Sequence, residues 1–82
     1  MTKFNAVINN VEVRGHEVKQ SKQGENYVLV RVEDETGTSI ELIDKDIDRA
    51  KYYKRGTLMD ITVNVVASKF TTIRIVDAKE IK

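Results

Sequence analysis

Basic and aromatic side chains occur together in three parts of the sequence. Aromatic rings can stack on unpaired bases and cations can follow phosphates, so these groups suggest the binding of a single nucleic acid strand. The groups are Arg14, Lys19, Lys22, Tyr27 and Arg31; Arg49, Lys51, Tyr52, Tyr53, Lys54 and Arg55; and Lys69, Phe70 and Arg74. From them we select as candidate contacts Arg14, Lys19, Lys22, Tyr27, Arg31, Tyr53, Lys54, Arg55, Phe70 and Arg74.

Structural roles compete with this interpretation at each position. A Lys or Arg near an aromatic residue is common on ordinary sheet surfaces, where it is only solvated. Of Tyr52 and Tyr53, we expect one to pack in the core and the other to be exposed, and the sequence leaves the choice open. Phe70 could instead stabilise a hairpin or a dimer contact, and Phe4 is expected in the core.

The sequence lacks the motifs of common catalytic and metal sites. It has no Cys and a single His, His16, which excludes thiol chemistry and multi-histidine metal sites. A Gly-x-Ser-x-Gly elbow and a phosphate-binding loop are also absent from the sequence. Asp44, Asp46 and Asp48 alternate as in a calcium loop, but the Gly and closing Glu are missing, so we expect them to cap a helix. We therefore predict no enzymatic activity, no metal and no cofactor.

Composition indicates one small domain, residues 1–82. The chain has 14 Lys and Arg against 13 Asp and Glu, so any nucleic acid site requires the charges to be segregated. Residues 33–48 contain seven acids and only one cation, Lys45, which predicts an acidic pole or edge. The longest apolar run, residues 27–30, is too short to span a membrane, and we expect a protein of the host-cell cytoplasm.

Alternation of apolar and polar residues predicts five strands. The 11 Val and 8 Ile against 3 Leu favour sheet over helix. The expected strands are residues 3–18, 25–33, 38–43, 58–66 and 70–76, with turns at 21–26 and 34–37. In the second strand Val28, Val30 and Val32 point to the core. A change of phase at Asn9 and Asn10 predicts a β-bulge in the first strand.

A short helical segment separates the third and fourth expected strands. Asp44 and Asp46 can cap it, Ile47 and Ala50 follow at helical spacing, and Gly56 ends it. Three strands, a short helix and two strands make up an all-β domain, which we predict to be a five-stranded Greek-key OB-fold barrel. An SH3-like barrel is the alternative, but it usually places its helical turn between the last two strands.

The chain resembles the single-stranded-DNA-binding proteins of filamentous phages, the gene-five type. The resemblance is carried by Ser21-Lys22-Gln23-Gly24-x-x-Tyr27-x-Leu29, by Tyr53 and Gly56 before the fourth strand, and by a closing hairpin with alternating apolar and Arg residues. It implies that Lys22 and Tyr27 contact DNA, and more loosely that Phe70 and Arg74 do.

These observations together predict a protein that coats single-stranded DNA, with RNA as an alternative ligand, largely without sequence preference. The resemblance implies a role in replication or transfer of a phage or mobile element. We expect a homodimer, because a chain this small benefits from a shared apolar patch, for which Val66, Phe70 and Val76 are candidates. The alternative function is a protein-binding OB or SH3-like module that acts as a small phage-encoded regulator.

Overall fold

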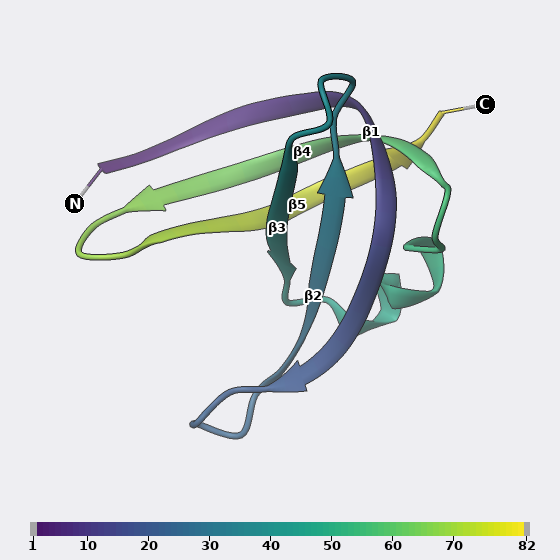
Figure 1. Cartoon of the computed structure of the whole chain (residues 1–82). Helices are drawn as coiled ribbons and strands as arrows, with labels where there is room; N and C mark the ends of the chain where they lie inside the picture. Colours follow the sequence, from purple (N-terminus) through teal and green to yellow (C-terminus); the bar gives the residue numbers. More distant parts are fainter. Residues whose placement is uncertain (1, 82) are drawn as a thin grey trace.

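The computed structural model describes residues 2–81 as five strands and one short helix around a single core (Figure 1). The elements are β1 (Thr2–Gln20), β2 (Asn26–Glu33), β3 (Ser39–Asp44), the 3-10 helix η1 (Ile47–Tyr52), β4 (Leu58–Ala67) and β5 (Thr71–Glu80). The predicted order of strands and helix is confirmed. No helix among these residues is long and apolar enough to cross a membrane.

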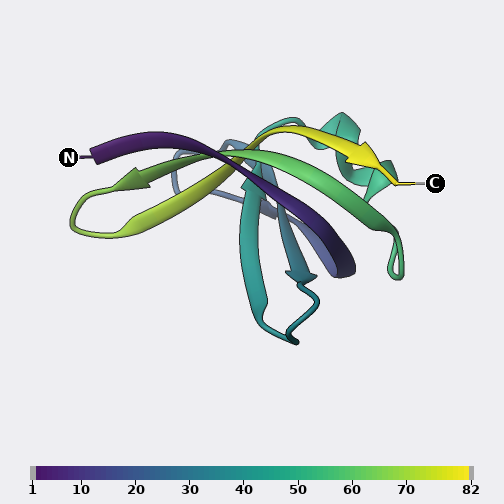
Figure 2. The ribbon, with the colours of Figure 1, turned by 90° about the horizontal axis from the view of Figure 1, so that it is seen from above.

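The strands close into a barrel in the order β1-β2-β3-β5-β4. The long strand β1 closes it, because residues 12–20 pair with β2 while residues 2–12 pair with β4. Neighbouring strands are antiparallel except β3 and β5, which run parallel and are paired at Ile43 and Arg74. The β2–β3 hairpin thus crosses the β1–β4–β5 layer, as the view from above shows (Figure 2).

Two irregularities let β1 serve both parts of the sheet. The register shifts between Ile8 and Val11, where Asn10 adopts a φ of 57°, and again between Val13 and Gly15. Asn tolerates the left-handed region better than most residues, and the Asn10 amide donates a hydrogen bond of 2.9 Å to Asp60 Oδ1. The bulge predicted at Asn9 and Asn10 is confirmed.

The core consists mainly of β-branched side chains from the inner faces of the strands. Val28, Val30 and Val32 are all fully buried, as the alternation of β2 predicts. The other core residues are Val11, Val13, Leu42, Tyr53, Met59, Ile61, Val63 and Ile75. Branched side chains are stiff and pack closely on a pleated surface, which suits a barrel too small for many large residues.

Phe4 is not in the core, so that prediction is wrong. Phe4 pairs with Val65, and Val65 pairs with Ile73, so Phe4 lies on the same face of the sheet as these two residues, which pack against the core. However, the beginning of β1 extends beyond the barrel together with the β4–β5 hairpin (Figure 2), and Phe4 is 51% exposed there. The phase of its alternation is that of a core residue, but the barrel ends before its position.

Candidate nucleic-acid interface

The outer face of β2 carries Tyr27, Leu29 and Arg31, as predicted. The register places Leu29 beside Ile43 of β3, and Ile43 beside Arg74 of β5. On the other side of β2, Tyr27 pairs with Lys19 of β1. Partners on neighbouring strands share a face of the sheet, so Leu29 and Ile43 form an apolar row that ends at Arg74 of β5, with Glu17 of β1 at its other end.

Tyr27 lies in a cleft between the β1–β2 turn, the end of β3 and the start of β5. The cleft has a volume of about 410 Å³ and is lined by Ser21, Gln23, Glu25, Asn26, Tyr27, Ile43, Lys45, Thr72 and Arg74. Tyr27 itself is half-buried, so the strand holds its ring while part of it faces the cleft. We call this site the Tyr27 cleft. It brings together three predicted elements of the binding chemistry: an aromatic ring, a hairpin and a cation from the last strand.

Lys45 is a lining residue that the sequence analysis did not select. Asp44 pairs with Val28 across β3 and β2. Because Lys45 follows Asp44 and Tyr27 precedes Val28, both lie at the same end of this strand pair. In the sequence Lys45 lies within an acidic run, and only the register of β2 and β3 shows that it adjoins Tyr27. Within residues 2–81, neither Lys45 nor Arg74 forms an ion pair.

The β1–β2 turn is held in shape by its own hydrogen bonds. Backbone bonds of 2.8 Å from Ser21 N to Glu25 O and 3.0 Å from Gly24 N to Ser21 O close it. Ser21 Oγ accepts a third bond from the Glu25 amide, and Gly24 takes a positive φ of 85°. Lys22 is exposed on this turn and has no ion-pair partner in the described part of the chain.

Three of the predicted cations are paired with acids on the same surface. The shortest distances are 3.2 Å from Arg14 to Glu12 and 3.9 Å in each of the pairs Lys19–Glu17 and Arg31–Glu41. Exposed pairs of this kind contribute about 0–1 kcal/mol, so phosphate can compete for these cations. Arg31 nevertheless lines a small outer cleft together with Glu17 and Glu41, which makes it a weaker candidate than Lys22 or Arg74.

Phe70 is the most exposed large apolar residue of the described chain, at 77%. It lies at the tip of the β4–β5 hairpin, two residues before Thr72, which lines the Tyr27 cleft. Val76 lies further along β5, where its carbonyl oxygen accepts a hydrogen bond from Arg49. Six residues of extended strand separate Phe70 from Val76, about 20 Å. The patch predicted from Val66, Phe70 and Val76 is therefore not contiguous.

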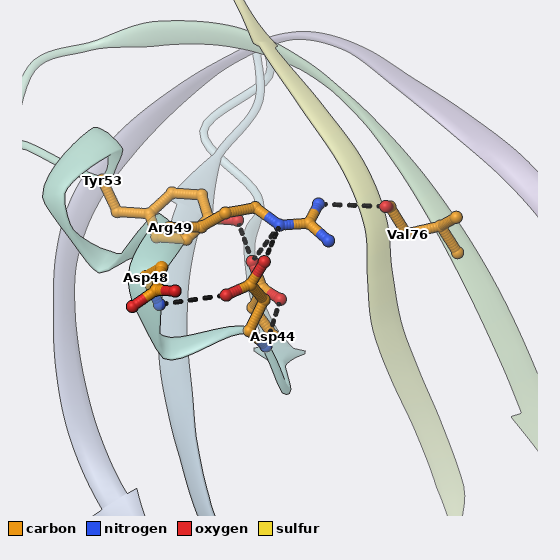
Figure 3. A network of polar contacts seen from close by, with 6 residues as sticks. Asp44, Asp48, Arg49, Tyr53 and Val76 are labelled. Carbon is orange, nitrogen blue, oxygen red and sulfur yellow. Dashed lines mark hydrogen bonds and ion pairs between the residues drawn. The ribbon is translucent and has the colours of Figure 1, made fainter.

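Tyr53 is removed from the candidate contacts, because its side chain is fully buried. Its hydroxyl donates a hydrogen bond to Asp44, a carboxylate that is itself buried and lies 3.4 Å from Arg49 Nε (Figure 3). Arg49 also donates a bond of 2.9 Å to the Val76 carbonyl oxygen. This network ties η1 to the end of β3 and to β5, and its role is structural.

The environment of Tyr53 keeps its phenol protonated. Burial raises the pKa of Tyr53 far above its usual value, and the hydrogen bond to the Asp44 carboxylate raises it further. Asp44 in turn accepts a bond of 2.9 Å from the Asp46 amide, while Asp46 caps η1 by accepting from the Asp48 amide. The predicted capping role is thus confirmed for Asp46, whereas Asp48 lies in the first turn and Asp44 supports the buried network instead. Within residues 2–81, no group of three or more His, Asp or Glu side chains could hold a metal ion.

Lys54 and Arg55 do not lie with Tyr27. They follow η1, and Lys54 lines a separate cleft with Tyr52, Met59 and Glu80. Glu80 is six residues beyond Arg74 on β5, so about 20 Å of strand separates this site from the Tyr27 cleft. The second basic group of the sequence therefore belongs to another part of the surface.

Six of the seven acids of residues 33–48 form two groups at opposite ends of β3, and the seventh, Glu41, lies on β3 between them. Glu33, Asp34 and Glu35 lie at the β2–β3 turn, whereas Asp44 to Asp48 lie where β3 leads into η1 (Figure 1). Asp34 stabilises the β2–β3 turn, because its carboxylate accepts hydrogen bonds from the Thr36 hydroxyl and from the Thr38 amide. These bonds lower the pKa of Asp34.

One comparison with known proteins, that with solved structures, supports the fold. No protein-family model matches the chain, and no curated protein matches it. Among solved structures, a mitochondrial single-stranded-DNA-binding protein from S. cerevisiae is similar, with a TM-score of 0.79 and 11% sequence identity over 100% of this chain and 98% of that one. At this identity the likeness concerns the fold, and the predicted five-stranded OB-fold with a short helix between strands three and four is confirmed.

Proposed function

We propose that this protein binds single-stranded DNA, largely without sequence preference, in the Tyr27 cleft. Tyr27 and the exposed Phe70 supply rings on which bases can stack, and Lys22, Lys45 and Arg74 supply cations for the phosphates. Neither kind of contact reads a base edge, so the strand is bound by its backbone and by the faces of its bases. The mechanism is non-catalytic: cations displace counterions and the strand is sequestered.

The observation that carries the proposal is the position of Tyr27. A half-buried ring is fixed by its strand, and the side that faces the cleft lies between a turn bearing Lys22 and a strand bearing Arg74. A packing residue has no need of cations on both sides. The fold adds support, because the face around strands two and three of an OB-fold commonly binds oligonucleotides. The similar yeast protein is itself described as a single-stranded-DNA-binding protein.

The biological setting that we propose is replication or transfer of a phage or mobile element, in the cytoplasm of the host cell. Its support is the hairpin Ser21-Lys22-Gln23-Gly24-x-x-Tyr27-x-Leu29, which resembles the DNA-binding hairpin of the gene-five type. In the structure this segment forms the turn and strand that border the Tyr27 cleft.

We also propose that the protein forms a homodimer through the start of β1. Residues 2–8 of β1 pair with β4 on one edge, and no described strand pairs with their other edge. An unpaired edge of this length is a template for another strand, and Phe4 offers an exposed ring beside it. Antiparallel pairing of two such edges would continue the sheet across the dimer.

Titration of fluorescein-labelled oligonucleotides tests the function, because the chain has no Trp to report binding itself. We expect anisotropy to rise with oligothymidylate and oligoadenylate at similar concentrations of protein, and with duplex DNA only at much higher concentrations. Equal binding of duplex and single strand would contradict base stacking. Absence of binding to DNA and to oligouridylate would favour the protein-binding module, for which the free edge of β1 is the available surface.

A further inference from the structure

A second cleft with an aromatic wall lies between η1 and the ends of β4 and β5 that are distant from their hairpin. It has a volume of about 300 Å³, and Lys51, Tyr52 and Lys54 form one side of it. Thr57, Met59 and Ala78 complete the lining together with the carboxylate-bearing Glu80. We call it the η1 cleft. The function proposed above makes no use of it.

Tyr52 has an environment unlike that of its neighbour. Tyr53 fills the core, whereas Tyr52 is 55% exposed and lines the η1 cleft. Lys51 Nζ lies 5.3 Å from the centroid of the Tyr52 ring, a cation–π contact that orients the ring and places a positive charge beside it. The ring is thus more than half exposed, and a cation lies close to it.

The composition of the η1 cleft matches a ligand that has both a flat apolar ring and a negative charge. The Tyr52 ring and the partly exposed Ala78 offer apolar surface beside the buried Met59, while Lys51 and Lys54 bring charge and Arg55 follows directly in the chain. In the part of the chain that the structure describes, none of these three cations forms an ion pair. Glu80 is the single acid among the lining residues, so positive charge prevails.

We propose that the η1 cleft binds a second segment of single-stranded nucleic acid, with a base on Tyr52 and phosphates on Lys51 and Lys54. This inference rests on the function proposed above and extends it. The two clefts do not form one continuous track, because about 20 Å of β5 separates Arg74 of the Tyr27 cleft from Glu80 of the η1 cleft. One molecule therefore contacts two separated segments, of one strand or of two.

A site-resolved titration tests the inference on the whole chain. Amide shifts of the 15N-labelled protein are followed during addition of an oligothymidylate of about 3 nucleotides, which is too short to bridge the two clefts. We expect the amides of Tyr27, Lys45 and Arg74 to follow one binding curve. Those of Lys51, Tyr52 and Thr57 should follow a second curve with its own dissociation constant.

Variants separate the two sites. Y52A should raise the dissociation constant of the second curve by about tenfold, since stacking of one base contributes about that factor, and leave the first curve unchanged. Y52F keeps the ring and should bind at the second site as the wild type does. Y27A should raise the dissociation constant of the first curve and leave the second unchanged. For an oligothymidylate of about 30 nucleotides, long enough to reach both clefts, Y52A should also lower the overall affinity.

The outcomes distinguish this inference from the proposed function. Shifts confined to the Tyr27 cleft would overturn the second site and leave the proposed function standing. Shifts at η1 that follow the first curve and vanish in Y27A would also overturn it, because they would be transmitted from the Tyr27 cleft. Shifts confined to η1 would overturn the role of the Tyr27 cleft instead.

Discussion

Adjacent tyrosines at the end of η1 show how position decides what a residue does. Tyr53 is buried and donates to Asp44, while Tyr52 faces solvent with Lys51 over its ring. A buried phenol needs a hydrogen-bond acceptor, and Asp44 at the end of β3 provides it. Within residues 2–81, the exposed phenol of Tyr52 has no hydrogen-bond acceptor of this kind.

Tyr27 is the residue on which the proposed function depends most. Y27A should lower the affinity for oligothymidylate by about 1–3 kcal/mol, because one stacking surface is lost, while Y27F should retain most of the affinity. Anisotropy titration measures the binding, and thermal unfolding of the same variants measures stability. If Tyr27 serves packing instead, Y27A should lower stability by about 3 kcal/mol or more and leave the binding of the folded protein unchanged.

Tyr53 predicts a pH dependence of stability. The folded state holds the phenolic proton more tightly than the unfolded state, because burial and Asp44 raise the pKa of Tyr53. Its contribution is complete below the ordinary Tyr pKa of about 10, and the free energy of unfolding should fall above that pH by up to about 1.4 kcal/mol per pH unit.

Urea unfolding between about pH 9 and 11 measures this slope, and Y53F is the comparison. At neutral pH the variant should be less stable by about 1–3 kcal/mol, since Asp44 loses one donor. Above pH 10 its stability should fall less steeply than that of the wild type. Identical slopes would mean that the phenol of Tyr53 ionises equally well in both states.

At the scale of elements, two hairpin turns of similar geometry differ in what they border. Gly24 in the β1–β2 turn has a φ of 85° and Gly37 in the β2–β3 turn has a φ of 86°. Both glycines have room for a side chain. A Cβ added at Gly24 would lie 4.0 Å from Gln20 Nε2, and a Cβ added at Gly37 would have no atom within 4 Å. Only the β1–β2 turn borders the Tyr27 cleft.

These two glycines make a matched pair of variants. G24A and G37A should each cost about 1–2 kcal/mol of stability, because an L-residue is strained at positive φ. Only G24A should also weaken the binding of oligothymidylate, by displacing Lys22 and the rim of the cleft. Denaturant unfolding and anisotropy on both variants check this, and equal loss of affinity in the two would show that the β1–β2 turn has no special part in binding.

Local patterns predicted the elements, and contacts between distant segments decided the rest. The buried valines of β2 and the bulge at Asn10 follow from alternation within one strand. The choice between Tyr52 and Tyr53 depends on a carboxylate from β3, and the role of Lys45 depends on the β2–β3 register and the parallel pairing of β3 with β5. Alternation along one segment cannot report either.

At the scale of the molecule, the chain is almost neutral, so the proposed binding of single-stranded DNA would depend on a few well-placed cations. If Lys22 and Arg74 contact phosphates, log K should fall by about 0.7 per contact for each tenfold rise in salt. K22A and R74A should each reduce that slope, while K79A should not, because Lys79 lies five residues beyond Arg74 on β5, opposite Asp60. Titrations at several salt concentrations measure the slope, and a flat response in the wild type would remove the electrostatic mechanism.

Assembly is the remaining property of the whole molecule that the structure makes testable. The free edge of residues 2–8 and the exposed Phe4 lie together, whereas Phe70 lies on the turn at the tip of the β4–β5 hairpin. Sedimentation at micromolar concentration should report a dimer for the wild type and for F70A. F4D should sediment as a monomer, because a carboxylate at the new interface would be desolvated without a partner. A monomeric wild type would remove the dimer, and a dimer that survives F4D but not F70A would move the contact to the hairpin tip.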